Sequence, residues 1–284
     1  MGQREIIEEV LLRSPNRRAM FKKLAFAGAV VAGAARAQSS TPAPSDVVQF
    51  ALNLEYLEAE FYSVATTGLT LAQQGGVALT GSGTAGATTT RFSNPVNFTS
   101  SAAFRVAINI ATDEMNHVIG LRAALTANGI TPIAKPAINL DALLPMGASL
   151  GNQPAFLILA RIFEDIGVSA YSGAAPLLAG SPYLATAARI LAVEGEHVGN
   201  IRLQSALLSI PSPQLDAADI VPPPAGTNYF STNPANGLCA IRTPGQVLYL
   251  AYGAANATSG GFFPNGVNGA INASSAPAPA TNLS

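Results

Sequence analysis

The two histidines of this chain, the only ones in its 284 residues, stand in the same sequence setting. Each follows a glutamate by three positions, as Glu114-x-x-His117 and Glu194-x-x-His197, and each is followed by Val and, five residues on, by Arg. Residues three apart on a helix share one face, so each pair can bind a metal ion together. A single pair of this kind is weak evidence. Two copies that use every histidine predict a metal site built by two helices.

Two further segments carry a lone glutamate on an apolar helical surface, followed seven residues later by tyrosine: Glu55 with Tyr62, and Glu164 with Tyr171. Seven residues span about two helical turns, so both members of a pair lie on one face. The chain thus reads Glu-x6-Tyr, Glu-x2-His, Glu-x6-Tyr, Glu-x2-His, an internal two-fold repeat. Glu58 lies one turn beyond Glu55 on the same face and is the rival ligand there.

The chemistry of these side chains predicts the kind of ion. A buried carboxylate costs several kcal/mol unless it is paired or bound to a metal. Four carboxylates and two neutral imidazoles carry a charge that two divalent ions would balance. Carboxylate and imidazole ligands suit Fe or Mn. We therefore expect two Fe or Mn ions, held by six residues: Glu55, Glu114, His117, Glu164, Glu194 and His197.

The predicted fold is an all-α four-helix bundle over residues 46–210. Apolar periodicity and capping signals predict four long helices, at 46–66, 101–127, 154–172 and 182–209. The connection 67–99 is rich in Gly, Thr and Ser and allows a β-hairpin, whereas 130–152 is long enough to cross the length of the bundle. Residues 211–284 are rich in Pro, Gly and Asn and predict an irregular C-terminal extension, with a short helix at 246–252.

The N-terminus predicts export. Arg17-Arg18 precedes a short apolar run, and Ala35-Arg36-Ala37 supplies small residues at a cleavage site, so residues 1–37 read as a twin-arginine-type signal peptide and 38–45 as a linker. The alternative is a chance basic N-terminus on a cytoplasmic protein. Removal of 1–37 would take seven Lys/Arg and three Asp/Glu, leaving a net charge of about −5, which argues against nucleic-acid binding.

The charge content raises the question of a membrane span, and the length of the apolar runs argues against one in the mature chain. Only 11% of residues are charged, against roughly 25% in typical soluble domains. The most apolar run, Leu24 to Ala35, is nevertheless shorter than the ~18 residues that a spanning helix needs. The single cysteine, Cys239, cannot form a disulfide within the chain, and we expect a buried, inert thiol.

The sequence resembles ferritin-like domain proteins, and within them an exported group related to desiccation-associated proteins. The resemblance covers about 46–210 and rests on Leu54–Tyr62, Glu114-x-x-His117, Phe163–Tyr171 and Val193–His197. It implies that Glu55 and Glu164 are terminal ligands, Glu114 and Glu194 bridge the two ions, and His117 and His197 are nitrogen ligands. Tyr62 and Tyr171 would orient carboxylates from outside the ligand set.

The resemblance implies chemistry with oxygen or peroxide, either ferroxidase-like oxidation of Fe(II) or peroxide removal of the manganese-catalase kind. Two alternatives stay open: a protein that binds metal without turnover, and a metal-free structural bundle for stress or desiccation protection. A small homo-oligomer is compatible with the long 67–99 connection and the C-terminal extension, which would obstruct a storage cage.

Other charged residues are not expected to bind the metal. Asp165 lies about 100° round the helix from Glu164. Glu60 and Glu196 are expected to be solvated or salt-bridged, and Arg122 and Arg202 are expected to pair with acidic residues.

Overall fold

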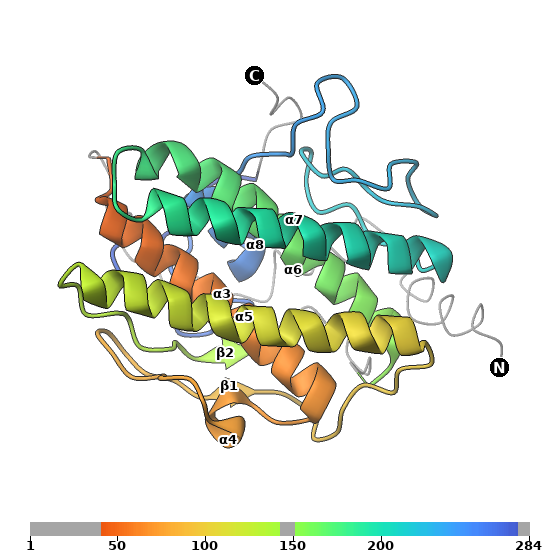
Figure 1. Ribbon diagram of the computed structural model, residues 1–284, viewed down its shortest axis with the longest axis horizontal. Coiled ribbons are helices and arrows are strands. Elements are labelled where there is room, and N and C mark those ends of the chain that lie inside the picture. The colour runs from red at the N-terminus through yellow and green to blue at the C-terminus, as the bar shows by residue number, and fades with distance from the viewer. Residues whose placement is uncertain (1–40, 143–150, 278–284) are drawn as a thin grey trace.

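The computed structural model describes residues 41–142 and 151–277, and the predicted signal peptide lies outside these ranges. Four long helices form the bundle: α3 (Pro44–Thr67), α5 (Ser101–Ala127), α6 (Gln153–Ala174) and α7 (Leu184–Leu207). The helix α3 packs mainly against α5, and α6 mainly against α7. Within each pair the helices run antiparallel, and α5 ends at the opposite end of the bundle from the point where α6 begins (Figure 1). The predicted all-α bundle is therefore confirmed.

Local signals in the sequence set most helix boundaries. The side chains of Ser100 and Asn152 accept hydrogen bonds from backbone N–H groups in the first turns of α5 and α6. At the end of α3, Gly68 adopts a left-handed conformation with φ of 75° and closes the helix. The start of α3 differs from the predicted residue 46: the helix begins at Pro44, whose fixed φ suits the first turn.

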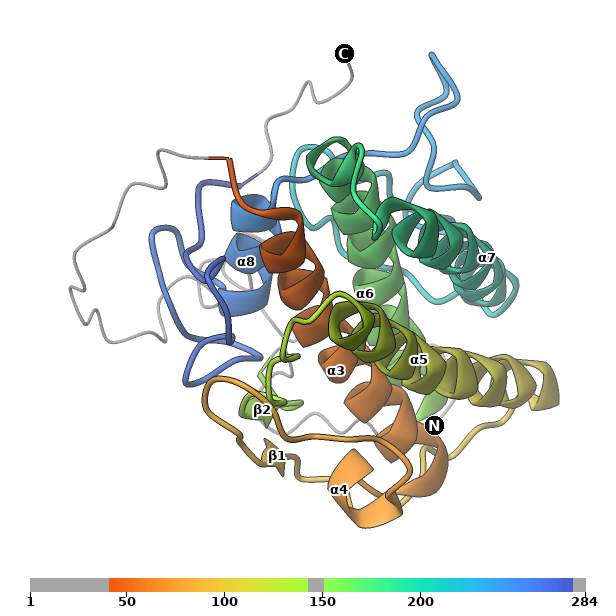
Figure 2. The ribbon, with the colours of Figure 1, turned by 60° about the vertical axis from the view of Figure 1, so that its left-hand side comes forward.

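The helix α3 is buried on nearly all sides, because two other parts of the chain cover the faces that the bundle leaves open. One cover is the 68–99 connection, which contains α4 (Leu71–Gln74) and β1 (Thr88–Thr89). The other is the C-terminal extension with α8 (Pro244–Tyr252), which lies beside α3 (Figure 2). This arrangement explains why the sequence of α3 is apolar around most of its circumference.

The hairpin expected in 67–99 is absent from the described structure. Instead, β1 pairs in parallel with β2 (Ile138–Asn139) of the α5–α6 connection. Gly81 and Gly86 allow this pairing, because a Cβ at either position would collide with the backbone of residues 132–137. The two long connections therefore hold each other.

The C-terminal extension is joined to the bundle by polar side chains. Asn53 of α3 donates to the carbonyl of Asn268 at 2.9 Å and accepts from its N–H at 3.0 Å. Cys239, expected to be buried, is only half-buried, because it lies in the C-terminal extension at the edge of α6, with its Sγ 3.1 Å from Oγ of Ser172. No helix in the described ranges is long and apolar enough to cross a membrane.

Candidate metal centre

All six residues predicted as metal ligands lie at the centre of the bundle, each less than a tenth exposed. They form two overlapping groups, and within each group the potential ligand atoms all lie within 4.8 Å of one another. We call these groups the His117 position (Glu55, Glu114, His117, Glu194) and the His197 position (Glu114, Glu164, Glu194, His197). Glu114 and Glu194 belong to both groups, so the two groups share these carboxylates.

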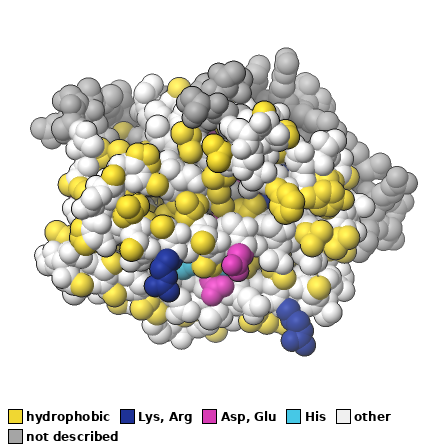
Figure 3. Space-filling model, turned by 45° about the horizontal axis from the view of Figure 1, so that its top comes forward, with side chains coloured by type: hydrophobic (Ala, Val, Ile, Leu, Met, Phe, Trp, Pro, Cys, Tyr) yellow, Lys and Arg dark blue, Asp and Glu magenta, His cyan; other side chains and the backbone are white. Residues whose placement is uncertain are grey.

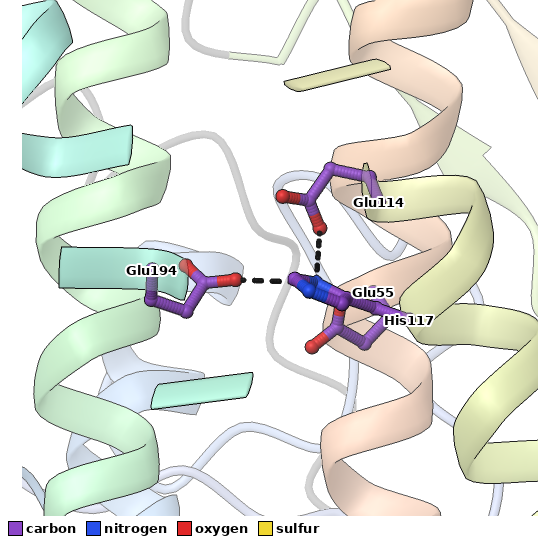
Figure 4. Close-up of side chains that lie close together, drawn as sticks. All are labelled: Glu55, Glu114, His117 and Glu194. Atoms are coloured by element: carbon purple, nitrogen blue, oxygen red, sulfur yellow. Dashed lines mark hydrogen bonds and ion pairs between the residues drawn. The ribbon is translucent and has the colours of Figure 1, made fainter. Parts of the chain in front are cut away.

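Each histidine turns its Nδ1 atom toward the carboxylates. In the His117 position, Nδ1 lies 3.2 Å from Oε2 of Glu55 and 3.5 Å from Oε1 of Glu194 (Figure 4). In the His197 position, Nδ1 lies 3.0 Å from Oε1 of Glu114. The same atom is 3.1 Å from Oε2 of Glu164. The two rings have centroids 6.1 Å apart. Every one of these nitrogens could serve as a metal ligand.

Hydrogen bonds from the two tyrosines join helix α3 to helix α6. The hydroxyl of Tyr62 on α3 donates a hydrogen bond to Glu164 on α6, and the hydroxyl of Tyr171 on α6 donates to Glu55 on α3. Each Tyr therefore supports the glutamate of the other half of the repeat. A fixed donor of this kind orients a carboxylate and leaves its second oxygen directed at the interior.

The carboxylate of Glu194 is accommodated by a glycine. A Cβ on Gly167 of α6 would collide with Oε2 of Glu194 and would lie 3.4 Å from Oε1 of Glu58. Neither oxygen of Glu194 has a hydrogen-bond partner among the described residues, although both are buried. The contact of Oε1 with Nδ1 of His117 is long, at 3.5 Å, and a buried anion with so little compensation is costly, so this site suits cations. The residues present thus fit two divalent ions.

Comparison with known proteins agrees with this geometry. The sequence profile of the ferritin-like domain family matches residues 44–206, more than half of the chain and the whole of the four-helix bundle. The chain belongs to this family. No curated protein matches the sequence.

The electrostatics of this ferritin-like domain show how the cluster exists without metal. Burial would lower the pKa of His117, but the charge of Glu55 and a hydrogen bond with Glu114 raise it to about 10. The carboxylates of Glu164 and Glu114 overcome burial in the same way and raise the pKa of His197 to about 12. Both imidazoles are then protonated at neutral pH. Two imidazolium groups therefore offset part of the carboxylate charge.

Three carboxyl groups of the cluster resist ionisation. Burial, together with the charge of Glu55, raises the pKa of Glu114 to about 7. Burial and the charge of neighbouring glutamates, Glu114 first among them, place the pKa values of Glu58 and Glu194 well above the usual range. Glu55 differs, because the charge of His117 outweighs burial and lowers its pKa.

Glu58, the rival to Glu55, lies near the centre but outside both groups of potential ligands. Its position in the repeat corresponds to Gly167, three residues after Glu164 as Glu58 is three residues after Glu55. A Cβ at 167 would lie 3.4 Å from Oε1 of Glu58, so the two equivalent positions of the repeat face each other near the centre. Glu55, which accepts from Tyr171, is the member of the pair that shares a group with a histidine.

The other charged residues differ in part from expectation. Asp165 pairs with Arg202 at 2.8 Å, away from the cluster, and Glu60 is an ion-pair partner of Lys135 at 3.4 Å. Glu196 is exposed. The expected acidic partner of Arg122 is wrong for the described structure, since that guanidinium donates to the Tyr56 hydroxyl at 2.7 Å and to backbone carbonyls. The 67–99 connection and the loop after α5 supply those carbonyls.

Sequence reasoning missed two residues of the centre. Gly167 carried a usable signal, because a glycine inside a helix costs about 1 kcal/mol relative to alanine and needs a packing reason. Asp113, whose Oδ2 lies 3.3 Å from Nε2 of His197, carried none, because the contact joins α5 to α7 across the bundle.

Proposed function

We propose that this ferritin-like protein holds two Fe or Mn ions and uses them to oxidise Fe(II) or to consume oxygen or peroxide. The observation that carries the proposal is the buried pair of overlapping ligand groups that share Glu114 and Glu194. A lone glutamate from each of two helices with Glu-x-x-His from the other two is the ligand set of carboxylate di-metal bundles. The bound ions would supply the change in oxidation state that such a reaction needs.

The burial of the centre supports a small substrate. The ligands are 0–8% exposed, so a large organic molecule could not reach them without rearrangement of the bundle. Figure 3 shows one face with a histidine just visible between basic and acidic side chains. Since both histidines of the chain belong to the centre, this is a place where the centre approaches the surface. Oxygen, peroxide and a single metal ion are all small enough for such an approach.

The chain's own residues would hold and protect the reaction. Tyr62 and Tyr171 fix two carboxylates, and Gly167 leaves room for a third. Glu58, whose pKa is raised well above the usual range by burial and by the charges of neighbouring glutamates, could supply a proton near the centre. Export of the folded chain through the twin-arginine pathway, as the N-terminus predicts, would allow the ions to be inserted beforehand.

A metal-free structural role in stress protection is the second candidate. The observation in its favour is the pairing of both histidines with carboxylates, which reduces the charge of the core without ions. Metal content separates the two. Elemental mass spectrometry of natively purified protein should find about two Fe or Mn per chain, and the metal-free chain should regain two on reconstitution.

Turnover is tested next. Anaerobic protein given two Fe(II) per chain and then oxygen should consume oxygen faster than Fe(II) in buffer, and the Mn form should be assayed for peroxide loss. Variant His197→Ala should take up one ion instead of two while far-ultraviolet circular dichroism stays helical. Absence of metal after both purification and reconstitution would refute the di-metal proposal and favour the structural role. Two bound ions without any turnover would favour metal binding alone.

A further inference from the structure

The two halves of the centre have matching ligands but unequal surroundings. Each position contains one lone glutamate, the two shared glutamates and one histidine. The difference lies just before the shared glutamates, where the repeat aligns Asp113 of α5 with Val193 of α7. One half of the centre thus has an extra carboxylate that the other lacks.

That carboxylate contacts the outer nitrogen of a predicted ligand. Oδ2 of Asp113 lies 3.3 Å from Nε2 of His197, while Nδ1 of the same ring faces the interior. In the ranges that the structure describes, Nε2 of His117 has no hydrogen-bond or ion-pair partner, and the contacts of that ring with carboxylates all use Nδ1. The asymmetry of the sequence is therefore an asymmetry of contacts.

A carboxylate on the outer nitrogen has a defined effect on a metal-binding histidine. It accepts a hydrogen bond from Nε2–H, which keeps the proton on that nitrogen and leaves the Nδ1 lone pair free for the ion, and it fixes the ring orientation and increases the basicity of the imidazole. We propose that Asp113 is a positioning residue that makes the two metal positions unequal, so that the His197 position fills first and holds its ion more tightly. This inference rests on the proposed metal binding.

A surface ion pair would have a different signature. Asp113 is half-exposed, with 45% of its side chain accessible, and pairs of that kind contribute only about 0–1 kcal/mol to stability. The proposed role acts on one ligand, so it predicts a loss confined to one binding step. The repeat also offers a gain of function, because a carboxylate at 193 would stand to His117 as Asp113 stands to His197.

The test is a titration of metal-free, full-length protein with Co(II), in which calorimetry and the visible spectrum of the bound ion monitor binding. Wild type should bind two ions in two resolved steps. Variant His117→Ala should lose the weaker step, and His197→Ala the tighter one. Asp113→Ala should weaken the tighter step by about 10- to 100-fold, the usual cost of losing such a partner, and leave the weaker step unchanged. Asp113→Asn, which keeps an acceptor without the charge, should lie between.

Two further variants make the result decisive. Val193→Asp should tighten the weaker step, and Glu196→Gln, which removes an exposed charge two residues from Glu194, should change neither step. Equal affinities in wild type, or equal weakening of both steps by Asp113→Ala, would overturn the inequality while leaving the di-metal proposal intact. Failure of wild type to bind two ions would overturn the di-metal proposal, and the inference with it.

Discussion

Replacing Gly167 with alanine would separate metal binding from folding. The new methyl group would lie within 3.0 Å of Oε2 of Glu194, a separation that Cβ atoms essentially never show. The carboxylate is the far end of a flexible side chain, so it can retreat by several tenths of an ångström. That shift exceeds the roughly 0.2 Å within which ligand distances must fall. Because Glu194 belongs to both positions, both ions should be affected.

Gly167→Ala should change the stability of the metal-free protein and its metal affinity in different ways. Alanine is favoured over glycine inside a helix by up to about 1 kcal/mol, so the metal-free Gly167→Ala protein should be as stable as wild type or slightly more stable. Affinity for each ion should fall at least about 10-fold, comparable to the loss of a supporting contact around a metal. Urea unfolding of the metal-free protein measures the first quantity, and Co(II) titration measures the second.

The matched control is Gly120→Ala on α5. A Cβ at 120 would meet nothing within 4 Å, so this variant should gain helix stability and keep both metal affinities. Wild-type affinity in Gly167→Ala would refute the assignment of Glu194 as a shared ligand. Loss of stability together with affinity would show that the site cannot relax, contrary to the reasoning above.

Three more outcomes follow from the structure. The pKa values of His117 and His197 are raised to about 10 and about 12, so metal binding should release protons and tighten as pH rises. Because these folded-state values exceed the unfolded value near 6.5, the metal-free fold should lose stability as pH rises from about 6.5 toward 10. Urea unfolding measured at several pH values would detect this loss. Tyr171→Phe should leave two ions bound but weaken the ion at the His117 position about 10- to 100-fold by freeing Glu55, as measured by Co(II) titration. Asp219→Ala should cost about 1.5–3 kcal/mol in urea unfolding, because it removes one of the two carboxylates that pair with the buried Arg161 and leaves Asp165 as the other.

A specific result would contradict each of these three predictions. A metal-free fold that gains stability with rising pH would mean that the histidines are neutral in the folded state. Unchanged Co(II) affinity in Tyr171→Phe would mean that the tyrosine does not orient its carboxylate. A loss below about 1 kcal/mol in Asp219→Ala would mean that the arginine finds water or another partner.

The sequence predicted what depends on helical periodicity. Glu114 and His117 are three residues apart, and the helix alone places them on one face, so their meeting required no knowledge of the fold. The repeat then paired Glu55 with Tyr62 along α3. The actual hydrogen bond of Tyr62 is to Glu164 on α6, because contacts across the bundle depend on how the helices are rotated against each other.

The parts that could not be predicted come from the long connections. The 67–99 segment looked capable of a local hairpin, but its strand pairs with residues 138–139, and strands joined by a tight turn cannot be parallel. Arg122 likewise donates to carbonyls that these connections supply. Such contacts join segments that lack a periodic pattern of apolar residues, so the spacing of residues in the sequence does not predict them.

The charge network under the C-terminal extension limits what can be learned from a shortened protein. Arg202 of α7 donates to the carbonyls of residues 220, 228 and 230, and Arg161 pairs with Asp219. A fragment ending at residue 206 would match the family's extent and yet expose two arginines that the intact chain buries. The minimal folding unit is therefore longer than the family domain, and any recombinant piece meant to carry the metal centre should retain the extension to at least residue 268, which clamps α3 through Asn53.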